Sequence, residues 1–244
     1  MISASPIRVR AALSGALRAA SRGLAPLLVG AVIVAALSWL AAHLARQHPL
    51  HDLPGRYSLV AIPAAAALVV SSPVLLGLST VCLRALRGDG SVWHALLAGL
   101  RRLGSACVAA GMIVAASALL AALTVGLMRL LSALSPQAGS YEDSVAMIVA
   151  VALGLVACAA VVVPFLGLAI AALADGLPVG DAISRASGSL RRNWGALATL
   201  GLLVTIVSAV LGGYLGAAGI TLALPWATAV MTAAYLQTTG EHLR

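Results

Sequence analysis

The sequence predicts an all-α integral membrane protein, and three observations predict it. Hydrophobic residues make up 61% of the 244 residues and charged residues only 9%, whereas a soluble domain carries roughly 25% charged residues. A soluble core of this size could not bury so much apolar surface. The apolar residues fall in six long runs, and arginines separate the runs. A helix needs about 20 apolar residues to cross a bilayer, so we expect a single membrane domain over residues 1–244.

The six apolar runs are expected to form six transmembrane helices. The first run exceeds the roughly 7–15 residues of a signal-peptide core, so we expect it to be retained. Prolines lie inside the second, fourth and sixth runs, and a short glycine-rich turn between the last two predicts a tight hairpin. The runs are Leu24–Leu44, Ser58–Leu83, Gly104–Leu127, Ser144–Leu173, Trp194–Leu215 and Gly219–Leu236.

The net charge of +8 is carried by arginine, since the sequence has no lysine. Twelve of the 15 arginines flank the runs on one side of the predicted topology, and Arg46, Arg56 and Arg129 flank them on the other. Basic residues favour the cytoplasmic side. We therefore expect a bacterial cytoplasmic (inner) membrane protein with both termini cytoplasmic and with 45–57 and 135–143 outside. The arginines form no single stripe, so no nucleic-acid partner is expected.

A short amphipathic stretch precedes each odd-numbered run. The three stretches contain Ser14–Arg18 (SGALR), Ala98–Arg102 (AGLRR) and Ser187–Arg192 (SGSLRR), and apolar residues recur around them at helical spacing. Arginine-rich amphipathic helices lie in the headgroup layer of a bilayer. We therefore expect three amphipathic interfacial helices, one before each odd-numbered span.

The even-numbered runs also correspond to one another. Each contains a proline, at Pro73, Pro164 or Pro225. Each then reaches a glycine, at positions 88, 176 and 240. The order of these matches predicts a pseudo-threefold internal repeat of an interfacial helix and two spans, with units of about 5–88, 89–176 and 177–240.

The last 80 or so residues carry a family resemblance. Its elements are a proline-containing span, an Asp-Gly turn, an amphipathic helix with a basic end, and a tryptophan that opens the next span. The matching residues are Pro164, Asp175, Gly176, Ala182, Ser187, Leu190, Arg191, Trp194, Pro225 and Tyr235. This pattern resembles the bacterial YciC-like and DUF975-type membrane proteins, and the membrane domain of some glycerophosphodiester phosphodiesterases. The resemblance implies a polytopic membrane protein without an assigned activity or catalytic residues.

Two basic pairs are the candidate functional residues. Arg101 with Arg102, and Arg191 with Arg192, close the second and third amphipathic stretches. Guanidinium groups bind phosphates well, so the pairs could contact lipid headgroups or an acidic partner. The alternative is that they only set the topology.

Other polar residues have simpler interpretations. Asp89, Asp175 and Asp181 are expected to cap backbone amides at turns or helix starts. His48, His51 and Asp52 lie in a proline-containing loop that we expect to be solvated, with metal binding or pH sensing as the alternatives. Buried structural thiols are expected at positions 82, 107 and 158. No cofactor or metal is expected.

The sequence contains none of the common catalytic or nucleotide-binding motifs, so we do not expect an enzyme. The favoured function is a non-enzymatic scaffold or accessory subunit of an envelope or export system, with the lipid bilayer and another membrane protein as partners. A transporter or lipid-handling permease is the alternative, because repeats and proline-broken helices are typical of transporters. An intramembrane enzyme is the third hypothesis.

Overall fold

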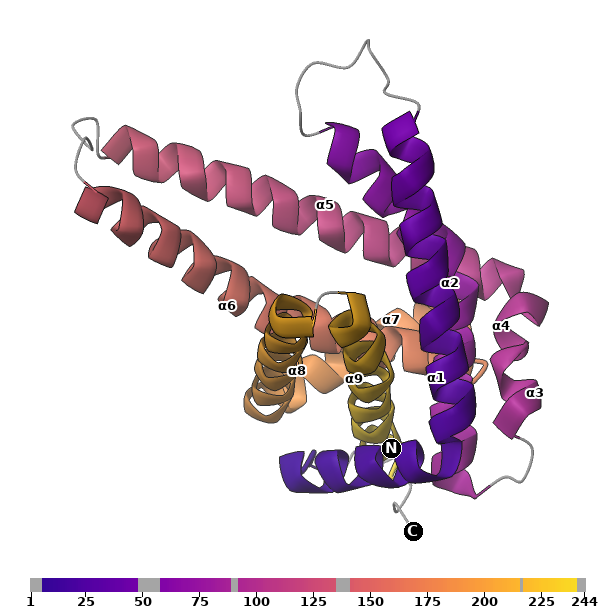
Figure 1. Cartoon of the computed structure of the whole chain (residues 1–244). Helices are drawn as coiled ribbons and strands as arrows, with labels where there is room; N and C mark the ends of the chain where they lie inside the picture. The colour runs from indigo at the N-terminus through magenta and orange to yellow at the C-terminus, as the bar shows by residue number, and fades with distance from the viewer. Residues whose placement is uncertain (1–5, 48–57, 89–91, 135–140, 216, 241–244) are drawn as a thin grey trace.

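The computed structural model describes residues 6–47, 58–88, 92–134, 141–215 and 217–240, and this part of the chain is helical without strands (Figure 1). Each predicted apolar run lies within one long helix. Trp194–Leu215 coincides with its helix. The other helices extend beyond their runs, and α1 also includes the first amphipathic stretch because it begins at Val9. The elements are α1 (Val9–Gln47), α2 (Ser58–Arg87), α3 (Val92–Leu96), α4 (Ala98–Arg101), α5 (Leu103–Leu134), α6 (Tyr141–Ala174), α7 (Val179–Arg192), α8 (Trp194–Leu215) and α9 (Ala217–Thr238).

A short helix turns into a long one at three places. Within α1 the backbone leaves helical geometry at Gly23, with φ −118° and ψ 19°. Arg102, between α4 and α5, has φ −113° and ψ 52°, and Asn193, between α7 and α8, has φ −120° and ψ 33°. The backbone angles of all three residues lie near the bridge region. One residue in this conformation interrupts the helix, so the chain changes direction without a loop. Each predicted interfacial segment is therefore followed directly by a long helix, whereas the internal repeat itself stays a prediction.

The prediction of one continuous second interfacial helix is wrong, because the segment forms two short helices, α3 and α4, that are separated at Leu97. Packing against α2 explains the break. A Cβ atom on Gly99 would collide with the Pro73 carbonyl oxygen, and one on Gly77 would collide with the Leu96 carbonyl oxygen. The two backbones are in direct contact, so the segment follows the surface of α2 and does not continue as one straight helix.

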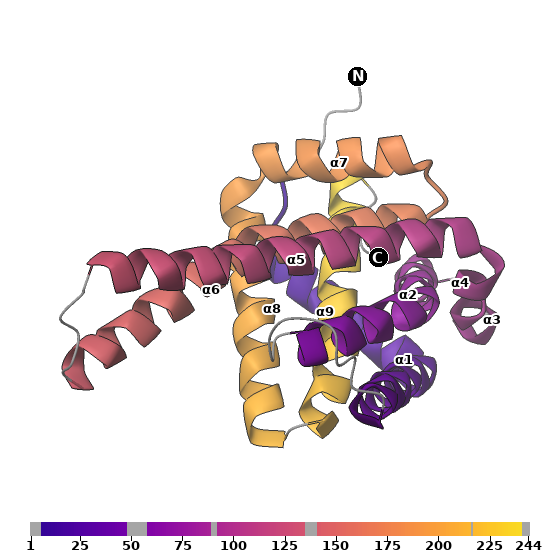
Figure 2. The same cartoon turned by 90° about the horizontal axis from the view of Figure 1, so that it is seen from above.

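Helices α1, α2 and α9 form the packed centre of the molecule, with α6 and α8 against them. Figures 1 and 2 show that α5 and α6 leave this centre together as a long hairpin. We call its outer part, residues 122–134 and 141–155, the arm. Small side chains dominate the buried faces, as at Ala12, Ala16 and Ala19 of α1, which are at most 1% exposed. Small residues let helices approach closely, as is usual in membranes.

Glycines also mark the closest helix crossings between the later elements. A Cβ on Gly201 of α8 would lie 2.7 Å from both Pro164 and the Ala160 carbonyl oxygen of α6. Pro164 of α6 is therefore packed closely against α8. Gly219 brings α9 against the Leu211 carbonyl oxygen of α8, which makes the predicted tight hairpin.

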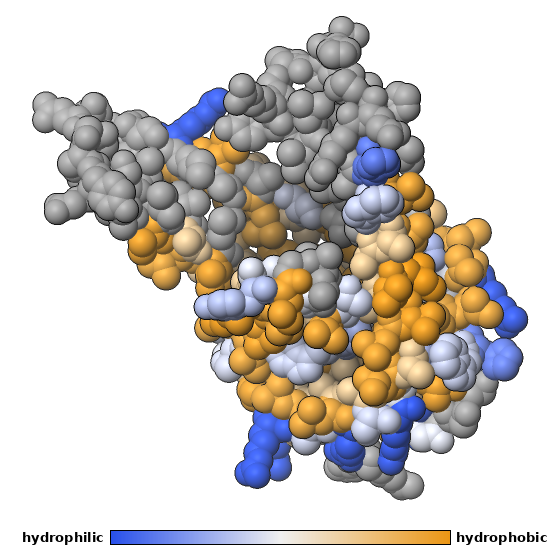
Figure 3. Space-filling model, viewed as in Figure 1, coloured by the Kyte–Doolittle hydropathy of each residue, from blue (hydrophilic) through white to orange (hydrophobic). Residues whose placement is uncertain are grey.

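Large apolar side chains are widely exposed. Leu17 and Trp39 are each 67% exposed, and Leu153 is 65% exposed. On the face seen in Figure 3, hydrophobic residues form broad areas, and the most hydrophilic residues lie mainly at its edges. Exposed apolar patches of this extent are characteristic of membrane or protein interfaces.

Four helices in the described part of the chain are long and apolar enough to cross a membrane. These segments are Val9–Leu37, Leu103–Leu127, Ala152–Ala174 and Trp194–Leu215. They indicate a membrane protein. The second and sixth predicted spans form α2 and α9, whose C-terminal halves are buried by the other helices, so crossing by these two helices stays a prediction.

The expectation of buried thiols is correct for Cys82 only, because Cys107 is exposed and Cys158 is partly exposed. An apolar run in a membrane helix exposes one side, so apolar neighbours do not imply burial. The loop that carries His48, His51 and Asp52 lies outside the described residues.

Candidate functional site at the arginine-rich end

Asp175, the residue after α6, contacts α2 and α9 directly and is connected to α7 through Tyr235. Its carboxylate accepts hydrogen bonds from Arg87 of α2, at 2.6 Å and 3.2 Å, which form a bidentate ion pair. The Tyr235 hydroxyl of α9 donates to the same carboxylate at 2.9 Å. Arg185 of α7 in turn donates to the Tyr235 oxygen at 3.5 Å. We call these four residues the Asp175 cluster.

The charge state of Asp175 follows from these contacts. Burial raises the pKa of its carboxyl. Hydrogen bonds from Arg87 and Tyr235, together with the charges of Arg87 and Arg185, act in the opposite direction and outweigh burial. The pKa of Asp175 therefore lies below its usual value, and the group is an anion at neutral pH.

A glycine turn positions Asp175. The Gly176 amide donates to the Leu173 carbonyl, and the Leu177 amide donates to the Ala172 carbonyl, as in a Schellman motif. This motif needs a left-handed residue, and Gly176 has φ +96°. The glycines that follow the other two proline-containing runs are also left-handed, since Gly88 has φ +85° and Gly240 has φ +76°. These three glycines are the positive-φ residues in the described part of the chain.

Arginines also satisfy carbonyl groups at the ends of α2 and α6. Arg102 donates to the Ala174 carbonyl at 2.8 Å, and Arg22 donates to the Ala85 carbonyl at 3.3 Å. The last carbonyls of a helix lack intrahelical partners and carry partial negative charge. Both arginines therefore stabilise helix ends. We call the part of the bundle that carries Arg22, Arg87, Arg102 and Arg185 the arginine-rich end.

The start of α1 is fixed to the other end of the chain. The Ile7 amide donates to the Asn193 side-chain oxygen at 3.1 Å, and the Arg8 amide donates to the Gln237 side-chain oxygen at 2.8 Å. The first amides of a helix otherwise lack acceptors. The N-terminal segment is thus hydrogen-bonded to the α7–α8 junction and to the end of α9.

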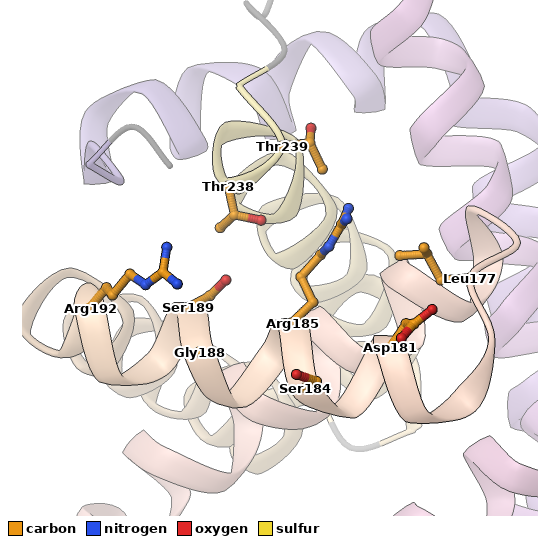
Figure 4. Close-up of a pocket in the computed structure, with 9 residues that line it drawn as sticks. All are labelled: Leu177, Asp181, Ser184, Arg185, Gly188, Ser189, Arg192, Thr238 and Thr239. Carbon is orange, nitrogen blue, oxygen red and sulfur yellow. The ribbon is translucent and has the colours of Figure 1, made fainter. Parts of the chain in front are cut away.

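Two cavities flank α7. The first, of about 390 Å³, lies between α7 and the last turn of α9, and Arg185 and Arg192 extend into it toward Thr238 and Thr239 (Figure 4). Both threonine hydroxyls already donate to backbone carbonyls of α9. This polar cavity therefore offers guanidinium groups beside a helix C-terminus, where the helix dipole disfavours an anion.

The second cavity, of about 490 Å³, lies between α5, α6 and α7. Its described lining is apolar except for Ser187 and Arg191. Basic residues thus face two different environments from adjacent positions on α7, because Arg192 lines the polar cavity and Arg191 lines the apolar one.

The structure separates the four predicted site residues. Arg101 is exposed, whereas Arg102 donates a hydrogen bond to the Ala174 carbonyl at the end of α6. Arg191 and Arg192 line different cavities, so the basic pairs do not form one common site.

The predicted capping role is wrong for Asp175, because it follows a helix end and its carboxylate pairs with Arg87. Asp181 lies in the first turn of α7 as predicted, and Asp89 lies outside the described residues. The roles of Arg87 and Arg185 were not predicted from the sequence, although their partners Asp175 and Tyr235 belong to the pattern on which the expected resemblance was based.

The Asp175 cluster is suited to holding helices together, and the two cavities beside α7 are suited to binding a ligand. The Asp175 carboxylate is engaged by three hydrogen bonds and an ion pair. No group of three His, Cys, Asp or Glu side chains among the described residues is placed to hold a metal ion. Comparison with protein-family models, curated proteins and solved structures gives no match.

Proposed function

We propose that the chain is a non-enzymatic scaffold or accessory subunit in a membrane assembly of the bacterial envelope. In this proposal six helices cross the inner membrane, both termini are cytoplasmic, and the arginine-rich end faces the cytoplasm. The four apolar helices described above support membrane crossing, and the arginine distribution supports the orientation.

The observation that carries the proposal is a base of helices joined by polar contacts, with a projecting arm. The Asp175 cluster ties α2, α6, α7 and α9 together at one end. The arm extends beyond this frame (Figures 1 and 2) and exposes Leu123, Leu130 and Leu153, which are 45%, 56% and 65% exposed. A fixed base and a long apolar hairpin suit contact with another membrane protein, because van der Waals packing drives helix association in lipid.

The test is extraction from native membranes in lipid-preserving polymer discs, followed by quantitative mass spectrometry. We expect one protein partner in stoichiometric amount. The variants Leu123→Trp and Leu153→Trp should release that partner because they enlarge the arm surface. The matched controls Ile206→Trp and Val210→Trp change exposed positions on α8 and should retain it. A protein purified without any stoichiometric partner, or one released equally by all four variants, would contradict the proposal.

A lipid-handling permease is the second candidate, and the apolar cavity beside Arg191 favours it. Transport would require the purified protein alone to move labelled lipid between the leaflets of a liposome. A scaffold would leave that lipid distribution unchanged.

A further inference from the structure

We propose that the cavity between α5, α6 and α7 binds an anionic phospholipid, with an acyl chain in the groove and the phosphate on Arg191. This inference rests on the membrane embedding in the proposed function and not on the scaffold role. Two independent features of the cavity carry it: an apolar lining, and a cation that contributes to that lining from α7.

The groove is shaped by side-chain size. Ala115 and Ala116 of α5 leave the floor open, whereas Val162 and the only phenylalanine of the chain, Phe165, form the wall on α6. Water in such a space would find few hydrogen-bond partners, so it is held poorly. Hydrocarbon fills the groove without losing any hydrogen bond, and burial of each methylene group is favourable.

The charged residue in the lining of the groove is Arg191, in the last turn of α7. Its side chain belongs to an exposed residue, and no hydrogen bond or ion pair joins it to another described residue. A guanidinium binds a phosphate through two parallel hydrogen bonds. Arg192 follows directly, so the local potential favours a headgroup with net negative charge over a zwitterionic one.

Neither feature alone identifies the ligand, but together they do. Inorganic phosphate would leave the groove empty, and a neutral hydrocarbon would leave Arg191 without a counterion. A phospholipid with a net negative charge fills the apolar groove and pairs with Arg191 at once. The class is therefore an anionic phospholipid such as phosphatidylglycerol.

The test is native mass spectrometry of the full chain in detergent, titrated with phosphatidylglycerol or phosphatidylcholine. We expect preferential retention of one phosphatidylglycerol. The Arg191→Gln variant should weaken this binding by about tenfold, as expected for loss of a charge-assisted contact. Ala115→Trp should weaken it at least as much, because the indole would occupy the groove. The milder Ala116→Leu should show an intermediate loss and remains informative if Ala115→Trp does not fold.

Two matched controls separate the site from general effects. Arg10→Gln removes one exposed charge that does not line the cavity, and Ala209→Trp adds an indole at an exposed position of α8. Both should bind phosphatidylglycerol as the wild type does. Equal loss in Arg10→Gln and Arg191→Gln would mean that the effect is general charge attraction and would overturn the proposal.

Competition identifies which part of the lipid is bound. Inorganic phosphate at millimolar concentration should not displace phosphatidylglycerol, because it lacks the acyl chain. Displacement by phosphate, with unchanged binding in Ala115→Trp and Ala116→Leu, would show a bare anion site and contradict the lipid proposal. Loss of the protein partner in the arm variants is measured separately, so either proposal can fail while the other holds.

Discussion

Asp175 shows how a single residue organises a bundle in which charges are scarce. Its carboxylate pairs with Arg87, 88 positions away in sequence, and accepts from Tyr235, 60 positions away. Within the described residues this is the one ion pair between side chains. The side chains of Asp175 and Arg87 are 19% and 32% exposed, so solvent screens the pair only in part. The cluster therefore fixes α2, α6 and α9 relative to one another at the arginine-rich end.

The variant Asp175→Asn should lower the free energy of unfolding by about 1–2 kcal/mol at pH 7, since it removes charge-assisted hydrogen bonds. The pKa of Asp175 is lower in the folded protein than its usual value. Its stabilising effect is thus fully present above about pH 4, the usual range for an unfolded carboxyl, and is lost as pH falls toward the folded-state pKa. Unfolding in detergent, followed by tryptophan fluorescence between pH 3 and pH 7, measures this effect.

The control for this prediction is Asp181→Asn, which changes an exposed carboxylate in the first turn of α7. It should cost only the helix-dipole interaction, about 0.3–1 kcal/mol. If the difference in the free energy of unfolding between wild type and Asp175→Asn stayed constant down to pH 3, the ionised carboxylate would not be the stabilising form of Asp175.

The site was only partly predictable for a physical reason. Asp175 and Tyr235 could be singled out, because both belong to the sequence pattern from which a family resemblance was expected. Their partners could not be, because any of the 15 arginines could in principle reach Asp175. Only the packing of α2 against α6 selects Arg87. Arg102 was expected to be available to lipid or a partner, yet the end of α6 already uses it.

At the scale of elements, helix existence was predictable and helix packing was not. Long apolar runs have few alternatives to helix, because unpaired backbone groups are costly in lipid. The buried face of a helix is harder to infer. In the first part of α1, Ala12 and Ala16 are buried whereas Leu17 is 67% exposed, the reverse of a soluble helix. Lipid removes the penalty for exposing leucine, so close backbone approach decides which face packs.

The contact between α4 and α2 tests this account of packing. Gly99→Ala should destabilise the protein by about 1–3 kcal/mol, because its Cβ would meet the Pro73 carbonyl and neither backbone can yield without moving a helix. Gly104→Ala in α5 is the matched control, since a Cβ there meets nothing within 4 Å. It should be neutral or stabilising by up to about 1 kcal/mol. Thermal unfolding in detergent compares the two variants, and equal behaviour would rule out the close contact.

The whole molecule combines an arginine-rich end with helices that expose apolar side chains. The ends of the chain meet at that face, through Ile7 with Asn193 and Arg8 with Gln237. The left-handed glycines at the ends of α2, α6 and α9 give these three helices the same kind of termination. This common geometry is what the proposed six-span topology requires, with every return to the arginine-rich side made by a proline-containing span.

The most direct measurement is the accessibility of single cysteines to a membrane-impermeant maleimide in intact bacterial cells. The background would carry Cys82→Ala, Cys107→Ala and Cys158→Ala. The reporters would be Ser21→Cys, Leu97→Cys and Ser184→Cys toward the cytoplasm, and His51→Cys and Ser140→Cys toward the outside.

We predict that His51→Cys and Ser140→Cys react in intact cells, and that the other three react only after permeabilisation. Labelling of Leu97→Cys in intact cells would mean that α2 does not cross the membrane. Labelling of Ser21→Cys and Ser184→Cys from opposite sides would contradict the common cytoplasmic face and, with it, the six-span account.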